Sequence, residues 1–244
     1  MLNVERSEIP TFGKMKSPFG GKILVIILLF ISSLTAQQFK ATVVKGDVKY
    51  QSGTSEFWFQ VKPNDVLQVD GIISTGKNSS LQLKESEEII NIGQSSAVSI
   101  SSIKKMTTDE LLLALAMEDM LNAPKTNGKG NTGTTAVYGE KEGKTTNITT
   151  NDFGIKRLNG AIQLAENGMK ESSVIFARET YRKYPETKQI ASYRIFFADI
   201  LFEKGLYSEA LGEYLEIQKL ELGKDQKNKV ESSINTINKI LLEN

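Results

Sequence analysis

The sequence lacks both cysteine and histidine in all of its 244 residues. Without cysteine the chain has no disulfide, no thiol nucleophile and no cysteine for lipid attachment. Without histidine it has no Ser-His-Asp triad, and the two absences together exclude zinc sites built from Cys and His. The core must therefore be stabilised without disulfides, and several classes of enzyme are excluded.

An excess of charge of one sign is also missing, because 30 Lys and Arg face 29 Asp and Glu, for a net charge of +1. Nucleic-acid binding needs clustered basic residues, so we expect no nucleic-acid partner. Glu56, Asp65 and Asp70 fall in separate predicted loops, without the paired spacing of acid–base catalysis. We therefore expect a protein that is not an enzyme, with no catalytic residue, cofactor or metal.

Long hydrophobic runs are scarce, and the main one lies at residues 23–31. Three lysines precede it and small residues follow it up to Ala36, which is typical of a secretory signal peptide over residues 1–36. Met15 is an alternative start. An uncleaved anchor is the alternative interpretation, although residues 23–36 are short for a helix across about 30 Å of hydrocarbon. We expect an exported, periplasmic protein, or otherwise one anchored in the inner membrane.

Residues 37–106 alternate short β-branched runs with turn residues, which predicts a small all-β roll or sandwich. The predicted strands are 41–44, 48–50, 58–61, 66–68, 71–74, 80–83, 89–92 and 97–103. Gly46-Asp47 and Pro63-Asn64-Asp65 supply turns between them. The single tryptophan, Trp58, is interpreted as a core plug between sheets, with a carbohydrate or peptide platform as the alternative.

An ordered set of short motifs runs through the same region. Its members are Val44-x-Gly46-x-Val48, Trp58, Val66-Leu67, Asp70-Gly71-x-Ile73-x-Thr75-Gly76, Ser79-Ser80-x-Gln82-Leu83, Ile89-x-Asn91-Ile92 and Ser96-x-Val98-x-Ile100. The set resembles the FecR domain over about 60 residues. It departs from that family at Pro63-Asn64-Asp65 and at Glu87-Glu88.

The FecR resemblance implies an extracytoplasmic module. The family's namesake is a periplasmic sensor with a cytoplasmic anti-sigma region, but at most 22 residues precede the apolar run of this chain. So short a segment cannot fold as such a domain. The resemblance thus implies a module used for binding or as a scaffold, with an envelope component as a possible partner.

Two segments follow the β region. The sequence predicts an amphipathic helix at residues 107–122, with Thr108 as its N-cap. Its apolar stripe is expected to pack within the chain or, alternatively, on a partner. The stripe contains Leu111, Leu112, Leu115, Met117 and Leu121. Residues 123–152 are rich in Asn, Thr, Gly and Lys and predict a disordered linker. Gly-Lys-Ser/Thr is missing from the glycine-rich residues 128–135, which argues against a phosphate loop.

Residues 153–244 show helical periodicity and an internal repeat at an offset of 37. Ala161, Leu164, Gly168, Ser173 and Ala177 align with Ala198, Leu201, Gly205, Ala210 and Tyr214. Each glycine is expected to end one helix and start the turn to the next. Five aromatic residues are interpreted as core rather than as a ligand cage: Tyr181, Tyr184, Tyr193, Phe196 and Phe197.

The repeat resembles the tetratricopeptide repeat, best at residues 198–211, with Pro185 at the expected end of the first unit and a closing helix at residues 227–242. Arg157 and Arg194 stand where the family has Trp. Such repeats bind proteins in a groove, which by position would contain Ile162, Glu166, Ile195, Asp199 and Phe202. The alternative is that these side chains pack within the chain or against a neighbouring chain.

Together these features predict a multidomain chain. An N-terminal all-β roll or sandwich is joined by a flexible linker to all-α, tetratricopeptide-like helical hairpins. The resemblances imply an exported scaffold protein of the bacterial cell envelope that binds a protein partner through its helical repeat. The alternative that we retain is a membrane-anchored envelope sensor.

Overall fold

The structure is a computed structural model that describes residues 38–53, 55–122 and 150–243. The predicted signal peptide and most of the predicted linker lie outside these residues. The β region holds eight strands in the described part: β1 Phe39–Lys45, β2 Val48–Gln51, β3 Phe59–Gln60, β4 Val66–Leu67, β5 Ile72–Thr75, β6 Ser80–Glu85, β7 Glu88–Ile92 and β8 Ala97–Ser99. The sequence predicted each of them, but the last one ends early, because Ile100–Ser102 turn into the 3-10 helix η2.

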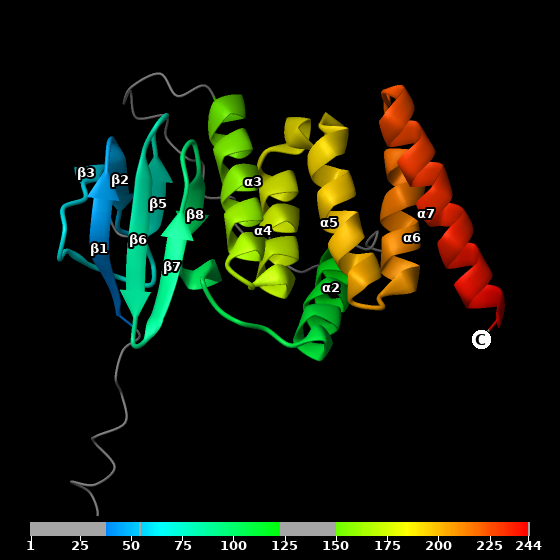
Figure 1. Cartoon of the computed structure of the whole chain (residues 1–244), viewed down its shortest axis with the longest axis horizontal. Coiled ribbons are helices and arrows are strands. Elements are labelled where there is room, and N and C mark those ends of the chain that lie inside the picture. Colours follow the sequence, from blue (N-terminus) through cyan, green and yellow to red (C-terminus); the bar gives the residue numbers. More distant parts are fainter. Residues whose placement is uncertain (1–37, 54, 123–149, 244) are drawn as a thin grey trace, which may run out of the picture. The chain divides into compact units, whose positions relative to one another are not determined.

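The strands form two antiparallel sheets, in the orders β4-β1-β6-β7 and β3-β2-β5-β8 (Figure 1). Alternate residues of β6, Leu81 and Leu83, are almost fully buried, as are Val48 of β2 and Ile73 of β5. This period of two puts one face of each sheet into the core. Gly46 and Asn64 adopt positive φ at 72° and 75°, as the predicted turns require.

Helix α2, Thr108–Asn122, packs against α4, so the predicted intramolecular contact of this segment is confirmed. Its N-cap is Thr107 rather than Thr108. The Thr107 hydroxyl accepts the Glu110 N–H at 3.2 Å, and the Glu110 carboxylate accepts the Thr107 N–H at 2.7 Å. These two reciprocal bonds form a capping box, which satisfies amide groups that a helix start leaves open.

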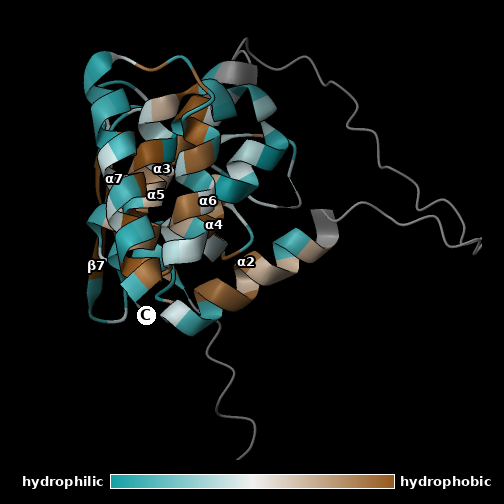
Figure 2. Ribbon diagram, turned by 90° about the vertical axis from the view of Figure 1, so that its right-hand side faces the viewer, coloured by the Kyte–Doolittle hydropathy of each residue, from teal (hydrophilic) through white to brown (hydrophobic). Residues whose placement is uncertain are grey.

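The predicted apolar stripe of α2 is only partly correct. Leu111 and Leu115 are buried, whereas Leu112 and Met117 are 43% and 56% exposed, and apolar residues occur around the whole helix (Figure 2). At 3.6 residues per turn, positions 111 and 115 share one face and position 117 lies on the opposite side. One face therefore packs on the fold while another faces solvent.

Two helical hairpins follow, α3 Thr150–Glu166 with α4 Lys170–Lys183, and α5 Ala191–Glu203 with α6 Tyr207–Ile217. The 3-10 helix η3, Pro185–Gln189, joins them, and α7, Lys224–Glu243, packs on α6. Thr150 to Asp152, which the sequence placed in the linker, belong to α3.

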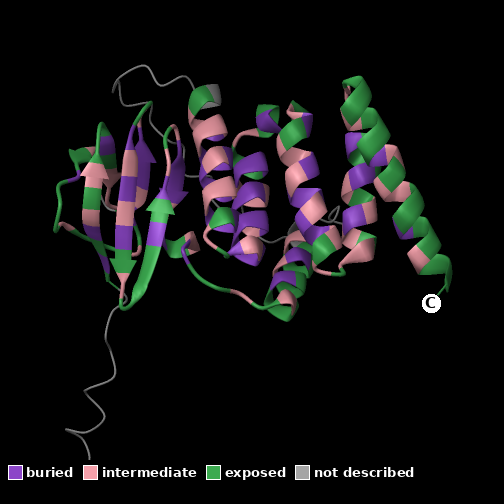
Figure 3. Ribbon diagram, in the orientation of Figure 1, coloured by how far each residue is buried: buried purple, intermediate pink, exposed green. Residues whose placement is uncertain are grey.

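Both hairpins turn in the same way. Gly168 and Gly205 have φ of 82° and 75°. At the first turn the Met169 N–H donates to the Leu164 carbonyl at 2.9 Å, and 37 residues later the Leu206 N–H donates to the Leu201 carbonyl at 3.0 Å. This six-to-one bond with a left-handed glycine is the Schellman motif, which satisfies carbonyls at a helix end. Apart from the two glycines, which are exposed, the residues aligned by the predicted repeat are buried at both positions. Buried positions recur along the facing sides of the hairpin helices (Figure 3).

Helix α3 lies directly against the edge strands β7 and β8, so the described residues from Gln38 onward form one compact unit. Gly160 permits the close approach, since a Cβ at this position would lie 2.1 Å from the Ala97 carbonyl oxygen. Gln163 accepts the Gly93 N–H at 2.9 Å, and Asn167 accepts the Asn91 N–H at 2.9 Å. Amide side chains of the helix thereby satisfy the open edge of β7.

Trp58 also lies at this junction, and the interpretation as a core plug between sheets is wrong. Its side chain is half-buried and packs edge-on against Phe153 of α3, with ring centroids 6.1 Å apart. Phe153 in turn packs against Tyr184 at 6.1 Å. The tryptophan directly precedes the two-residue strand β3, which lies at the edge of its sheet.

Candidate functional site

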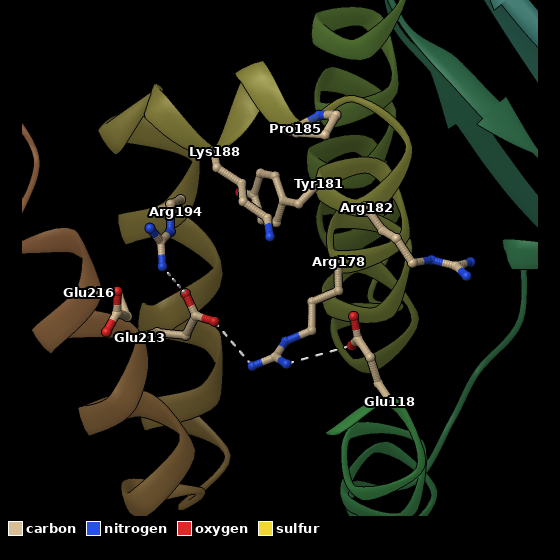
Figure 4. A pocket seen from close by; sticks show the side chains of 9 residues that line it. All are labelled: Glu118, Arg178, Tyr181, Arg182, Pro185, Lys188, Arg194, Glu213 and Glu216. Atoms are coloured by element: carbon tan, nitrogen blue, oxygen red, sulfur yellow. Dashed lines mark hydrogen bonds and ion pairs between the residues drawn. The ribbon is translucent and has the colours of Figure 1, made fainter. Parts of the chain in front are cut away.

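The candidate site is a groove of about 520 Å³ on the α4 and α6 side of the helical hairpins. Helices α2, α4, α5 and α6 and the short helix η3 contribute side chains to it (Figure 4). The groove is lined by Glu118, Arg178, Tyr181, Arg182, Pro185, Lys188, Arg194, Glu213 and Glu216. Its volume lies within the range of sites that hold a small molecule or a few side chains of a peptide.

Pro185 positions one wall of the groove. It starts η3 directly after α4, where its fixed φ suits a first helical position and its missing N–H costs no hydrogen bond. The buried Thr187 hydroxyl donates to the Tyr184 carbonyl at 2.6 Å and holds this tight turn. The turn brings Lys188 beside the end of α4 and carries the chain into α5.

An ion network connects the elements around the groove. Glu213 of α6 accepts from Arg178 of α4 at 3.1 Å and from Arg194 of α5 at 2.8 Å (Figure 4). Arg178 also pairs with Glu118 of α2 at 3.5 Å. These four side chains are at most a quarter exposed, so solvent screens the network less than an ordinary surface pair. The network holds three hairpin helices and α2 in register.

Tyr181 is the most unusual member of the groove. Its side chain is 8% exposed, and its hydroxyl has no hydrogen-bond partner among the residues that the structure describes. Burial, reinforced by the nearby Glu213 carboxylate, raises the pKa of Tyr181 far above its ordinary value, so the phenol is neutral. A buried hydroxyl is almost always hydrogen-bonded in folded proteins. Tyr181 therefore has an unused donor buried beneath the wall of the groove.

Lys188 and Arg182 supply charge that the network does not use. Both side chains are exposed, and neither forms an ion pair with a residue in the described ranges. Arg182 is close enough to Glu179 to contribute to lowering the pKa of that carboxyl. In Figure 4 the Lys188 side chain extends into the groove, whereas Arg182 points away from Glu213.

The five predicted groove residues do not line this groove. Ile195 is only 6% exposed and lies in the core. Asp199 accepts the Tyr214 hydroxyl at 2.5 Å and pairs with Lys229 of α7. The structure therefore uses both side chains for packing within the chain, which was the alternative interpretation.

The other three predicted residues lie on two different helices. Ile162 packs partly buried on the core, and Glu166 is exposed and accepts from Gln163 at 2.7 Å, both on α3. Phe202 of α5 packs against Tyr207 with ring centroids 5.6 Å apart. None of the three contributes to the groove.

Arg157 and Arg194, which are 37 residues apart at the offset of the predicted repeat, have different roles. Arg157 is 2% exposed, lies 4.3 Å over the Phe176 ring, donates to the Thr180 hydroxyl at 3.2 Å and is 3.4 Å from Glu179. Burial lowers the pKa of Arg157, and Glu179 partly opposes this shift. Arg157 is therefore a structural cation inside the first hairpin, whereas Arg194 reaches the groove.

Sequence reasoning missed this groove although it had singled out three of its members, among them Pro185 as the end of the first repeat unit. It interpreted Tyr181 as core, which its burial confirms, and Arg194 only as a family departure. The available signal was the clustering of Arg178, Tyr181 and Arg182 on one face of a helix, at the i, i+3 and i+4 spacing. Basic residues beside a buried phenol on a single face are unusual for a helix that only packs.

No family model, curated protein or solved structure matches the chain. In the described ranges, no helix combines the length and the apolar character that crossing a membrane requires. The same residues contain no cluster of three or more acidic side chains placed to hold a metal ion.

Proposed function

We propose that the chain is an exported, non-enzymatic interaction protein of the bacterial cell envelope, and that its helical hairpins bind a polypeptide partner in the α2–α4–α5–α6 groove. The observation that carries this proposal is Tyr181, which lines a groove rich in charged side chains and whose buried hydroxyl has no partner among the described residues. Leaving such a group unsatisfied costs stability. A bound partner would satisfy it.

The shape and chemistry of the groove favour a polypeptide over a small apolar ligand. Seven of its nine lining residues carry a charge, and they come from five separate elements. A chain with side chains of both signs can address several of these groups at once, as charge complementarity in protein interfaces does. The groove belongs to the tetratricopeptide-like part of the chain, whose family resemblance already implied a protein partner.

The FecR-like β region supplies the second contact in this proposal, with an envelope component. Phe57 and Phe59 are 66% and 55% exposed on either side of Trp58; Phe59 begins the edge strand β3, and Phe57 lies just before it. Exposed aromatic side chains of this kind are enriched in protein interfaces. Because the β region is packed on α3, both contacts would be held at a fixed separation, as a scaffold requires.

The experiment is site-specific photo-crosslinking in intact cells, with a photoreactive residue at position 188 in the groove. The matched control carries the same residue at position 239 of α7, where the lysine side chain is 76% exposed and does not line the groove. We expect a discrete protein adduct from position 188 only. Equal adducts from both positions, or none from position 188, would contradict binding in the groove.

Export is tested separately by intact-mass measurement of the protein recovered from its own cells. A mature chain that starts at Gln37 is the expected result. Retention of residues 1–36 would instead favour the membrane-anchored envelope sensor.

A further inference from the structure

Most charged side chains of the groove are paired with a charge of opposite sign, but one cationic side chain that extends into the groove is not. Glu213 and Glu118 are committed to Arg178 and Arg194, and Glu216 pairs with Lys219 at 2.5 Å. The cationic group that extends into the groove without an ion pair to the described chain is Lys188. A ligand therefore meets one uncommitted ammonium group rather than a uniformly basic surface.

The Tyr181 hydroxyl provides a second, independent indication. The Tyr181 side chain is more than nine-tenths buried and lines the same groove, and its hydroxyl lacks a partner among the residues described. A neutral phenol is a strong donor to an anionic oxygen, and charge-assisted hydrogen bonds are about twice as strong as neutral ones. An ammonium and a phenol together match the two oxygens of one carboxylate.

The acidic members of the groove decide which anion fits. Three glutamates line it, and each would repel a second negative charge brought close to it. A dianionic phosphate is disfavoured by this arrangement, whereas a single carboxylate can be compensated by Lys188 alone. The same glutamates suit neighbouring residues of a ligand that are neutral or basic.

We propose that the groove binds an acidic side chain of a polypeptide partner, with its carboxylate seated between the Lys188 ammonium and the Tyr181 hydroxyl. This inference rests on the proposed function, since it specifies the chemistry of the partner that the groove accepts. Arg182, at the rim, supplies additional attraction without touching the carboxylate.

The test measures binding of the full chain by calorimetry to two capped decapeptides, one alternating Glu and Ala and the other alternating Gln and Ala. Both are amidated at the C-terminus. A third peptide, alternating Gln and Ala with a free C-terminal carboxylate, separates a terminal from a side-chain carboxylate. We expect the Glu peptide to bind at least about tenfold more tightly than either Gln peptide, the ratio that one charged hydrogen-bonded contact typically provides.

Single substitutions test which side chains bind the carboxylate. Lys188→Gln and Tyr181→Phe should each weaken binding of the Glu peptide by about tenfold, the effect of losing one charge-assisted contact. The control Lys183→Gln removes a neighbouring positive charge that does not line the groove, and it should change affinity less than about twofold. Thermal melts of all three variants verify that they are folded.

Several results would overturn the inference. Equal binding of the Glu and Gln peptides, or no binding of either, would show that no carboxylate is recognised. An equal loss with Lys183→Gln would reduce the effect to net charge, and displacement by millimolar inorganic phosphate would indicate a general anion site. If photo-crosslinking from position 188 still yields a partner, only the carboxylate inference fails and the proposed function stands.

Discussion

Replacing Tyr181 with phenylalanine should stabilise the free protein, which is the opposite of what truncating a buried polar side chain usually does. The substitution removes one oxygen and keeps the aromatic ring, so the packing of the ring is preserved. In the free chain the hydroxyl is buried and has no hydrogen-bond partner among the described residues. Its removal therefore abolishes a desolvation cost without breaking a bond.

The size of the effect follows from that cost. A buried polar group without a partner destabilises a protein by about 1–3 kcal/mol, and the small void left by the oxygen offsets part of the gain. We expect the free energy of unfolding to rise by about 1 kcal/mol. For a chain of this length that corresponds to an increase in Tm of about 2–4 °C.

The matched control is Tyr214→Phe, in the second hairpin. Tyr214 is as buried as Tyr181, but its hydroxyl donates to the Asp199 carboxylate at 2.5 Å. Losing a hydrogen bond to a charged acceptor should lower stability by about 1.5–3 kcal/mol. Denaturant unfolding of both variants beside the parent protein gives the two signs in one experiment.

The reasoning is refuted if Tyr181→Phe lowers the free energy of unfolding by 1 kcal/mol or more. That result would mean that the hydroxyl has a partner in the free protein, so it would not be available to a ligand. A stabilised variant that also binds the Glu peptide more weakly would show the trade-off between stability and function that a binding site imposes.

Features that depend on neighbours in sequence could be predicted from the sequence. The turn at Gly46, the paired helix ends at Gly168 and Gly205, and the buried alternation of Leu81 and Leu83 are determined within a few residues. Positive φ favours glycine, and a period of two requires a covered face, whatever the rest of the chain does. The two antiparallel sheets and the helical hairpins followed from these local rules.

The contact between the β region and α3 could not be predicted in the same way. It depends on Gly160 meeting Ala97 and on amide groups at positions 159, 163 and 167 meeting the edge strands, across more than 60 residues of sequence. The stripe of amides at a spacing of four was visible in the sequence. Its partner was not, because an amide can bond equally well to water, to another helix or to a strand edge.

The groove that the structure shows could not be predicted from the sequence for a related reason. Family resemblance placed a groove on the first helices of each hairpin, but there Asp199 is used by Tyr214 and Lys229, and Ile195 is buried. The observed groove requires η3 to present Lys188 and α2 to bring Glu118 to Arg178. Neither placement follows from the period of an isolated helix, since both depend on how separate elements pack.

Three further substitutions test the fold around the site. Gly160→Ala should lower the free energy of unfolding by about 1–3 kcal/mol, because the added Cβ would overlap the Ala97 carbonyl oxygen, a backbone atom that cannot move aside. The control Gly212→Ala, whose Cβ meets open space on α6, should be neutral or stabilising in the same thermal melts. Thr107→Ala removes the N-cap of α2 and should cost about 1 kcal/mol by denaturant unfolding, whereas an unchanged midpoint would contradict the capping box. Glu179→Gln leaves the buried Arg157 without its counter-charge. Burial opposes ionisation of Glu179, but Lys183 and Arg157 outweigh burial and lower the pKa of this carboxyl. The ionised Glu179 therefore stabilises the fold above its unfolded pKa of about 4.5, and this contribution is lost as the pH falls through the lower folded pKa. Because Glu179 is one-third exposed, the variant should lose only about 1–2 kcal/mol at pH 7, and this difference from the parent should shrink steadily below about pH 4.5; a difference that stays constant down to pH 3 would mean that the ion pair does not contribute to stability.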